Sequence, residues 1–286
     1  MPSNRKNAAL YIVPALAAIM GAALFVLRKN HLKNGFEPPQ NLPYAGAASW
    51  RLLLFGLVVL FILALVTGIF VSRAAKHTEV RSSAVSIKTP ALFTVNFLFG
   101  AALIVCGGIL MLNDAYKTEL AGSGALWAAA ALGAVGIAAG IVQIAASCVF
   151  YSRKKVGYSG AARIMLLLPE IFTAYWVVIV YRHTQVNPSL PLFVFRIVSL
   201  AAASFFLYYR SGFFFYRASP GRFTFFSVAA IGFCGLLMAD TLPLSERLFA
   251  AAVLVLALVS LTVFVAGVVK GERRRRSFRI EGQEQQ

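Results

Sequence analysis

The feature that most constrains this chain is a series of eight long apolar runs separated by short polar segments. A run of about 18 or more apolar residues is long enough to cross a bilayer as an α-helix. The chain is 59% hydrophobic and only 13% charged, which excludes a soluble domain of this length. We predict an all-α bundle of eight membrane helices, with spans at about 8–27, 52–71, 91–112, 125–150, 161–181, 190–209, 223–239 and 248–269.

The basic residues indicate how this bundle is oriented. Most of the 27 Lys and Arg residues fall on the side that carries both termini, and basic loops favour the cytoplasmic side. We therefore expect cytoplasmic termini, one transmembrane domain over residues 1–270, and a disordered basic tail over residues 271–286. The first run follows Arg5 and Lys6 as a signal peptide would. Its length and its basic end favour a retained span, and the sequence alone leaves its removal open.

The net charge of +17 does not indicate a nucleic-acid partner, because the basic residues lie in short loops, as membrane topology requires. The expected partner is the lipid bilayer. Four consecutive arginines in the tail are predicted to bind anionic lipid headgroups at the cytoplasmic face: Arg273, Arg274, Arg275 and Arg276. The alternative is that this cluster only fixes the orientation of the last span.

One carboxylate lies well inside an apolar run. Glu170 follows Pro169 in the fifth predicted span, and ionisable groups at such positions face the protein interior and mark function. Arg196 is not the expected partner, because side chains lean toward the N-terminus of their own helix and these two helices run in opposite directions. Polar residues of other spans fall at similar depth and complete a candidate polar pocket: Glu170, Thr173, Asn96, Gln143, Ser147 and Ser227.

The sequence offers no catalytic, cofactor-binding or metal-binding motif. Residues 157–160 read GYSG, which matches the GxSG of rhomboid-type intramembrane serine proteases. That chemistry needs a histidine within reach of the serine, and all three histidines are predicted to lie in loops. Ser159 is better explained as the N-cap of the fifth span. We predict that the protein is not an enzyme and carries no cofactor.

The fourth span contains a GxxxG motif, Gly136 to Gly140. Small residues at this spacing let two membrane helices approach closely. The motif favours packing within one bundle, and a homodimer contact remains the alternative.

The C-terminal half contains LLLPE at residues 166–170, YR followed by NP, an aromatic-rich sixth run and a short turn with Asp240. In this arrangement the chain resembles uncharacterised bacterial multi-pass membrane proteins. The resemblance implies a bacterial cytoplasmic membrane and attaches no activity. Two functional hypotheses follow. The first is a non-catalytic membrane component, such as a sensor, scaffold or accessory subunit with a membrane-protein partner. The second is a small-solute or ion transporter with a pocket around Glu170.

Overall fold

The computed structural model describes residues 2–37, 42–43, 47–76, 89–112, 123–152, 160–184, 190–215 and 217–284. The described residues are almost entirely helical, and the chain has the architecture of a multi-pass membrane protein, as predicted. In the described residues, eight helices are long and apolar enough to cross a membrane. The helices are α1 (Pro2–Asn34), α2 (Ala48–Ala75), α3 (Pro90–Leu112), α5 (Ser123–Ser152), α6 (Gly160–Met165), α7 (Leu168–Thr184), α8 (Leu190–Gly212), α9 (Pro220–Leu237) and α10 (Leu244–Glu284). Two short strands after α1, Phe36–Glu37 and Leu42–Pro43, pair antiparallel.

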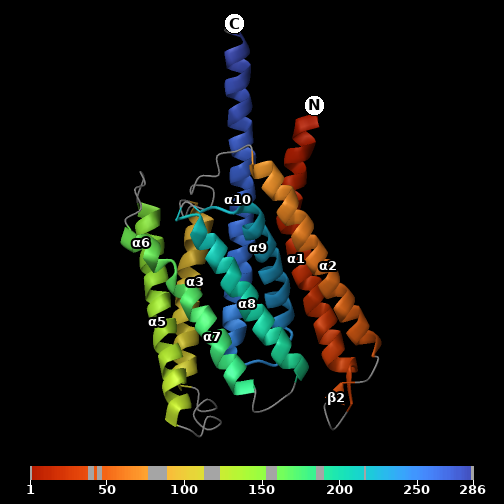
Figure 1. Cartoon of the computed structure of the whole chain (residues 1–286), viewed down its shortest axis with the longest axis vertical. Coiled ribbons are helices and arrows are strands. Elements are labelled where there is room, and N and C mark those ends of the chain that lie inside the picture. Colours follow the sequence, from red (N-terminus) through yellow and green to blue (C-terminus); the bar gives the residue numbers. More distant parts are fainter. Residues whose placement is uncertain are drawn as a thin grey trace.

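Both termini lie at the same end of the bundle (Figure 1). We call this end the terminal face and the other end the opposite face. An even number of spans requires this arrangement. Which face lies in the cytoplasm stays a prediction from the distribution of basic residues.

Six of the spanning helices form a closed ring. In the order α3, α5, α7, α8, α9 and α10, each helix packs on the next, and α10 packs back on α3. Helices α1 and α2 lie outside the ring and pack on each other and on α9. Figure 1 shows the same arrangement, with α1 and α2 on one side of the bundle and α5 on the other.

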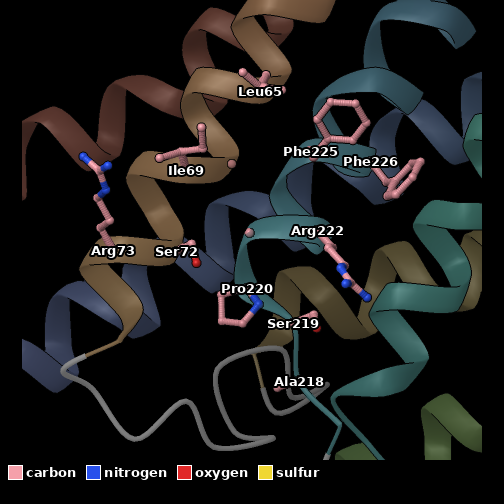
Figure 2. A pocket seen from close by; sticks show the side chains of 12 residues that line it. Leu65, Ile69, Ser72, Arg73, Ala218, Ser219, Pro220, Arg222, Phe225 and Phe226 are labelled. Carbon is pink, nitrogen blue, oxygen red and sulfur yellow. The ribbon is translucent and has the colours of Figure 1, made fainter.

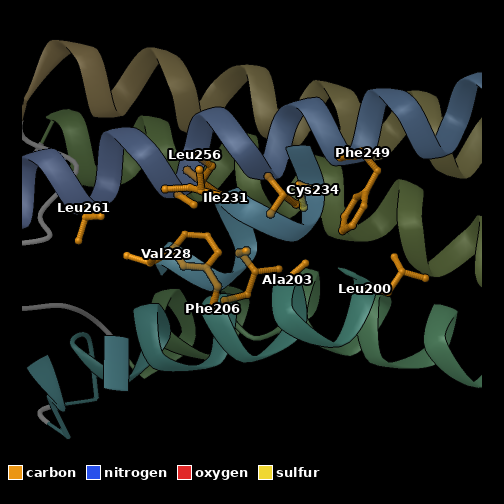
Figure 3. Close-up of a cluster of buried hydrophobic side chains, with 14 of the residues drawn as sticks. Leu200, Ala203, Phe206, Val228, Ile231, Cys234, Phe249, Leu256 and Leu261 are labelled. Carbon is orange, nitrogen blue, oxygen red and sulfur yellow. The ribbon is translucent and has the colours of Figure 1, made fainter. Parts of the chain in front are cut away.

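Helix α9 is the most enclosed span, because it packs on α1, α2, α8 and α10. In the most apolar stretch of α9, 67% of the residues are buried, whereas this share is 50% or less in every other span. Its side chains Val228, Ile231 and Cys234 meet residues of α8 and α10 in the apolar core (Figure 3). Apolar side chains gain little by leaving lipid, so close packing of this kind is what holds membrane helices together.

The GxxxG motif packs inside the bundle. A Cβ atom on Gly100 of α3 would lie 2.8 Å from the carbonyl oxygen of Gly140 of α5, and one on Gly136 would lie 3.0 Å from the Cα of Gly107. The backbones of α3 and α5 therefore touch, and only glycine fits there. Both glycines of the motif, Gly136 and Gly140, therefore pack against α3 of the same chain.

The fifth predicted span is interrupted rather than continuous. Helix α6 ends at Met165 and α7 begins at Leu168; between them, Leu166 and Leu167 donate backbone hydrogen bonds to residues three positions earlier. Pro169 explains the break, since proline lacks an amide proton and disfavours helical geometry in the residue before it. Glu170 consequently lies in the first turn of α7 rather than inside a continuous helix.

The last helix is longer than predicted at both ends. Helix α10 begins at Leu244, four residues before the predicted start of the eighth span, and continues to Glu284. The segment predicted to be a disordered tail therefore forms the end of α10, as far as Glu284. Its Arg and Glu residues have good helix propensity. The side chains of Arg273 to Arg276 lie outside the part of the chain that the structure describes, so the predicted headgroup contacts stay a prediction.

Candidate functional site

The terminal half of the ring contains a hydrogen-bonded network of three polar side chains from α3, α5 and α8. The Gln143 amide donates to Oδ1 of Asn96 at 2.6 Å, and Asn96 donates to the Leu92 carbonyl at 2.7 Å. The Arg210 guanidinium also donates to Asn96 Oδ1. Asn96 and Gln143 are fully buried, and Arg210 is 4% exposed. The structure therefore brings together two residues of the predicted pocket and adds an arginine that the sequence assigned to a loop.

Arg210 is the most unusual member of this network. Among the residues that the structure describes, it has a neutral amide as its partner and no carboxylate, and its buried Nε has no hydrogen-bond partner. A buried charge normally requires a counter-charge or several hydrogen bonds. Arg210 also lies across the ring from Asn96, since α8 and α3 are three positions apart in the ring. The contact therefore ties two opposite walls together.

Glu170 does not join this network. Its side chain is only partly buried, and its buried Oε2 has no hydrogen-bond partner in the described residues. Its position in the first turn of α7 is favourable for a carboxylate, because the helix N-terminus carries partial positive charge. The expectation that Arg196 is not its partner is confirmed, since Arg196 pairs elsewhere.

The remaining three predicted pocket residues are buried but bond to their own helices. Thr173 donates to the Pro169 carbonyl at 2.6 Å, and Ser147 donates to the Gln143 carbonyl at 2.7 Å. Ser227 donates to the carbonyl four residues earlier at 2.7 Å. Hydroxyls in helices often satisfy themselves in this way. The structure therefore does not join these three side chains to the network.

A cluster of aromatic side chains crosses the ring in its opposite half. Phe172 and Trp176 of α7 pack on Phe249 of α10, with ring centroids 6.2 and 5.1 Å apart. All three side chains are buried. Because α7 and α10 are also opposite members of the ring, these side chains fill its centre. Opposite helices of the ring are thus joined by the Arg210–Asn96 hydrogen bond in the terminal half and by the Trp176–Phe249 aromatic contact in the other half.

Near the opposite face, an ion pair joins α1 to the turn after α9. Nε of Arg28 lies 2.6 Å from Oδ1 of Asp240, and both side chains are completely inaccessible. The guanidinium also lies over the ring of Phe195 of α8, 4.7 Å from its centroid, a favourable cation–π geometry. Burial raises the pKa of the Asp240 carboxyl, and Arg28 opposes that shift.

A second ion pair lies near the same face. Arg196 of α8 pairs with Glu246 in the first turn of α10, and Glu246 is 2% exposed. The two pairs involve α1, α8, α10 and the α9–α10 turn. The sequence analysis missed both, because it assigned Arg28, Asp240 and Glu246 to loops. The sequence signal that could have indicated these ion pairs was the presence of basic and acidic residues at the same ends of neighbouring spans.

The histidines also differ from the prediction. His31 lies in α1 and is 1% exposed, and its Nδ1 is 3.3 Å from the Ser49 hydroxyl. Ser159 and His77 lie outside the described residues. Within the described residues, no group of three or more His, Cys, Asp or Glu side chains could hold a metal ion.

Comparisons with protein-family models, curated proteins and solved structures found no match to this chain. The resemblance to uncharacterised bacterial membrane proteins therefore stays a prediction. Function has to be inferred from the arrangement of the side chains themselves.

Proposed function

We propose that this protein is a non-catalytic membrane component, a scaffold or accessory subunit, whose polar interior holds its helices in one arrangement. The observation that carries this proposal is the pair of contacts across the ring. The Arg210–Asn96 hydrogen bond ties α8 to α3, and the Trp176–Phe249 contact ties α7 to α10. A bundle tied across both halves is suited to a fixed shape that a partner can recognise.

The ion pairs near the opposite face support the same proposal. A buried pair contributes little net stability, because desolvation of the two charges offsets their attraction. It does penalise arrangements in which either charge loses its partner. Arg28–Asp240 therefore favours one register of α1 relative to the α9–α10 turn, and Arg196–Glu246 favours one register of α8 relative to the start of α10.

Purification of the native complex tests this proposal. The tagged protein is solubilised from its own membrane in a mild detergent and analysed by native mass spectrometry. We expect a second polypeptide in fixed stoichiometry, retained by a variant carrying Arg217→Gln, an exposed position. A protein that purifies alone with a bound small solute would contradict the proposal.

A small-solute or ion transporter is the second candidate. Two observations favour it: the partly buried Glu170 with its unpartnered Oε2, and the buried Arg210 without a carboxylate partner in the described residues. Both lie toward the terminal face, where α6 and α7 are separated by a break. Intramembrane groups of this kind mark solute and proton pathways in transporters.

Flux measurements separate the two candidates. In reconstituted vesicles, a transporter that uses Glu170 should lose proton-coupled flux in Glu170→Gln while its thermal stability in detergent is unchanged. The scaffold proposal predicts no flux in the wild-type protein. Flux that depends on Glu170 would replace the first proposal by the second.

The membrane setting completes the proposal. We place the protein in a bacterial cytoplasmic membrane with both termini inside, and we expect the arginine cluster Arg273 to Arg276 to lie against anionic lipid. Each basic residue near such a surface contributes about 1 kcal/mol. A synthetic tail peptide that partitions equally into neutral and anionic vesicles would contradict the lipid contact.

A further inference from the structure

A hollow on the outer side of α9 has a polar part and an apolar part. The polar part, of about 610 Å³, lies between the end of α2 and the start of α9. The apolar part, of about 220 Å³, lies between α2 and α8 over the middle of α9. Phe225 and Phe226 line both parts, so the two form one groove, which we call the α9 groove.

Among the residues that the structure describes, the lining of the polar part includes two arginines and no acidic side chain. Arg73 from the last turn of α2 and Arg222 from the first turn of α9 line it, together with Ser72 and Ser219. Figure 2 shows Arg73 on α2 and Arg222 on α9 with the two serines between their helix positions; the two arginine side chains extend away from each other. Both arginines are exposed, so an anion can approach their guanidinium groups.

The backbone adds further hydrogen-bond donors at this point. Ser219 is the N-cap residue of α9, yet its side chain makes no capping hydrogen bond. The amide groups of Gly221 and Arg222 in the first turn are among those that a helix leaves without intrahelical acceptors. Helix N-termini bind anions through such amides, and here they open into a cavity that the two arginines already make positive.

The apolar part has the character of a site for a hydrocarbon chain. No charged side chain lines it in the part of the chain that the structure describes. Phe226 stacks between Phe205 and Tyr209 of α8, at centroid distances of 4.9 and 5.1 Å, and Phe225 packs edge-on against Phe61 of α2. The groove follows α9 from Arg222 to Phe233, which is about 16 Å at the rise of an α-helix.

The depth of the two parts of the groove in the bilayer indicates what kind of molecule can occupy both. The arginines lie at the ends of their spans, at the level where headgroups lie, and the apolar part extends from there toward the middle of the bilayer. We infer that the α9 groove binds a phospholipid with an anionic headgroup, with its phosphate between Arg73 and Arg222 and an acyl chain along Phe225 and Phe226. This site is separate from the ring interior and from the basic tail.

Native mass spectrometry of the full-length, delipidated protein tests this inference. The probes are phosphatidylglycerol, phosphatidylcholine with the same acyl chains, and soluble glycerol 3-phosphate. Phosphatidylglycerol should bind most tightly. Arg73→Gln with Arg222→Gln should weaken it about thirtyfold, as expected for two basic residues near an anionic surface, which corresponds to about 2 kcal/mol. Equal binding of both phospholipids would overturn the inference.

A matched control removes two other exposed basic residues from the terminal face. Arg217→Gln with Lys270→Gln changes the net charge equally, and neither residue lines the groove. This variant should keep most of the affinity; a loss equal to that of the groove variant would show general surface attraction and overturn the site. Glycerol 3-phosphate binding as tightly as the lipid would overturn the role of the acyl chain, and so would unchanged lipid affinity in Ala201→Phe, which narrows the apolar part.

Discussion

Nε of Arg28 in α1 lies 2.6 Å from Oδ1 of Asp240 in the turn after α9, with both side chains sealed from solvent and lipid. This pair connects a helix outside the ring to a turn of the ring near the opposite face. It shows that these two charged residues near the ends of their spans belong to the packed interior.

Removing one partner of this pair should destabilise the protein strongly. Arg28→Met leaves Asp240 buried without its cation, and loss of one partner of a buried pair costs about 3–5 kcal/mol. The double variant Arg28→Met with Asp240→Leu removes both charges and should recover most of the loss. Thermal unfolding of the four proteins of this cycle in detergent measures the coupling. Additive losses would contradict an interaction between the two residues.

The Arg28→Met variant should also show a characteristic pH dependence. Burial raises the pKa of Asp240, and Arg28 opposes that rise in the wild-type protein. Without Arg28, the folded-state pKa lies further above the unfolded-state value, so the folded variant binds more protons than its unfolded state over the window between them. Its stability should therefore rise as the pH falls from above the folded-state pKa of Asp240 toward the unfolded-state value, and Asp240→Asn in the same background should abolish this dependence.

The polar network should behave as a structural tie. Asn96→Leu leaves the Arg210 guanidinium and the Gln143 amide without their shared acceptor, which costs about 1–3 kcal/mol for a buried neutral group and more for a charged one. Ser227→Ala, which removes a hydroxyl bonded only to its own helix, is the control and should cost much less. Equal Tm shifts for the two variants in detergent would contradict the role of the network.

Glycine substitutions in α3 test the contact between α3 and α5. A Cβ on Gly100 would lie 2.8 Å from the Gly140 carbonyl oxygen, whereas one on Gly108 would meet nothing within 4 Å. Gly100→Ala should therefore destabilise the protein by about 1–3 kcal/mol. Gly108→Ala on the same helix should be neutral or stabilising, because alanine has the higher helix propensity. If Gly100→Ala changed the oligomeric state instead of the stability, the motif would serve a dimer.

Orientation can be measured with single cysteines in a cysteine-free background. Lys76 and Lys270 are exposed at the terminal face, and Arg51 and Arg247 are exposed at the opposite face. In intact cells, an impermeant thiol reagent should label Arg51→Cys and Arg247→Cys and leave Lys76→Cys and Lys270→Cys unlabelled. The reverse pattern would place the termini outside.

The number and class of the spans could be predicted from the sequence, because length and apolarity alone decide whether a helix can cross a bilayer. The pairing of Asn96 with Gln143 was also within reach, since both are isolated polar residues at similar depth. The ion pairs were not. A charge at the end of an apolar run looks like a loop residue in the sequence, and only tertiary packing shows that Arg28, Asp240 and Glu246 are buried.

Two further features depended on geometry that a one-dimensional pattern does not contain. Arg210 extends from the last turn of α8 to the far wall of the ring, and nothing in the local sequence indicates which helix it reaches. The groove over α9 combines α2 and α8, which are far apart in the chain and flank α9 in space. Pro169 itself indicated a break in the fifth span. Only the boundaries of α6 and α7 show that this break places Glu170 in the first turn of a helix.

Water access to the ring interior tests the central claim most directly. Ser147→Cys, Thr173→Cys and Ser227→Cys place near-isosteric thiols at three fully buried positions, and Lys76→Cys is the exposed control. Membrane vesicles of both orientations are treated with a small, charged thiol reagent, and labelling rates are compared before and after unfolding. We predict that the control reacts rapidly, whereas the three interior thiols react only after unfolding. Rapid labelling of any interior thiol in the folded protein would show a water-filled path through the bundle and contradict the account of a tied, closed ring.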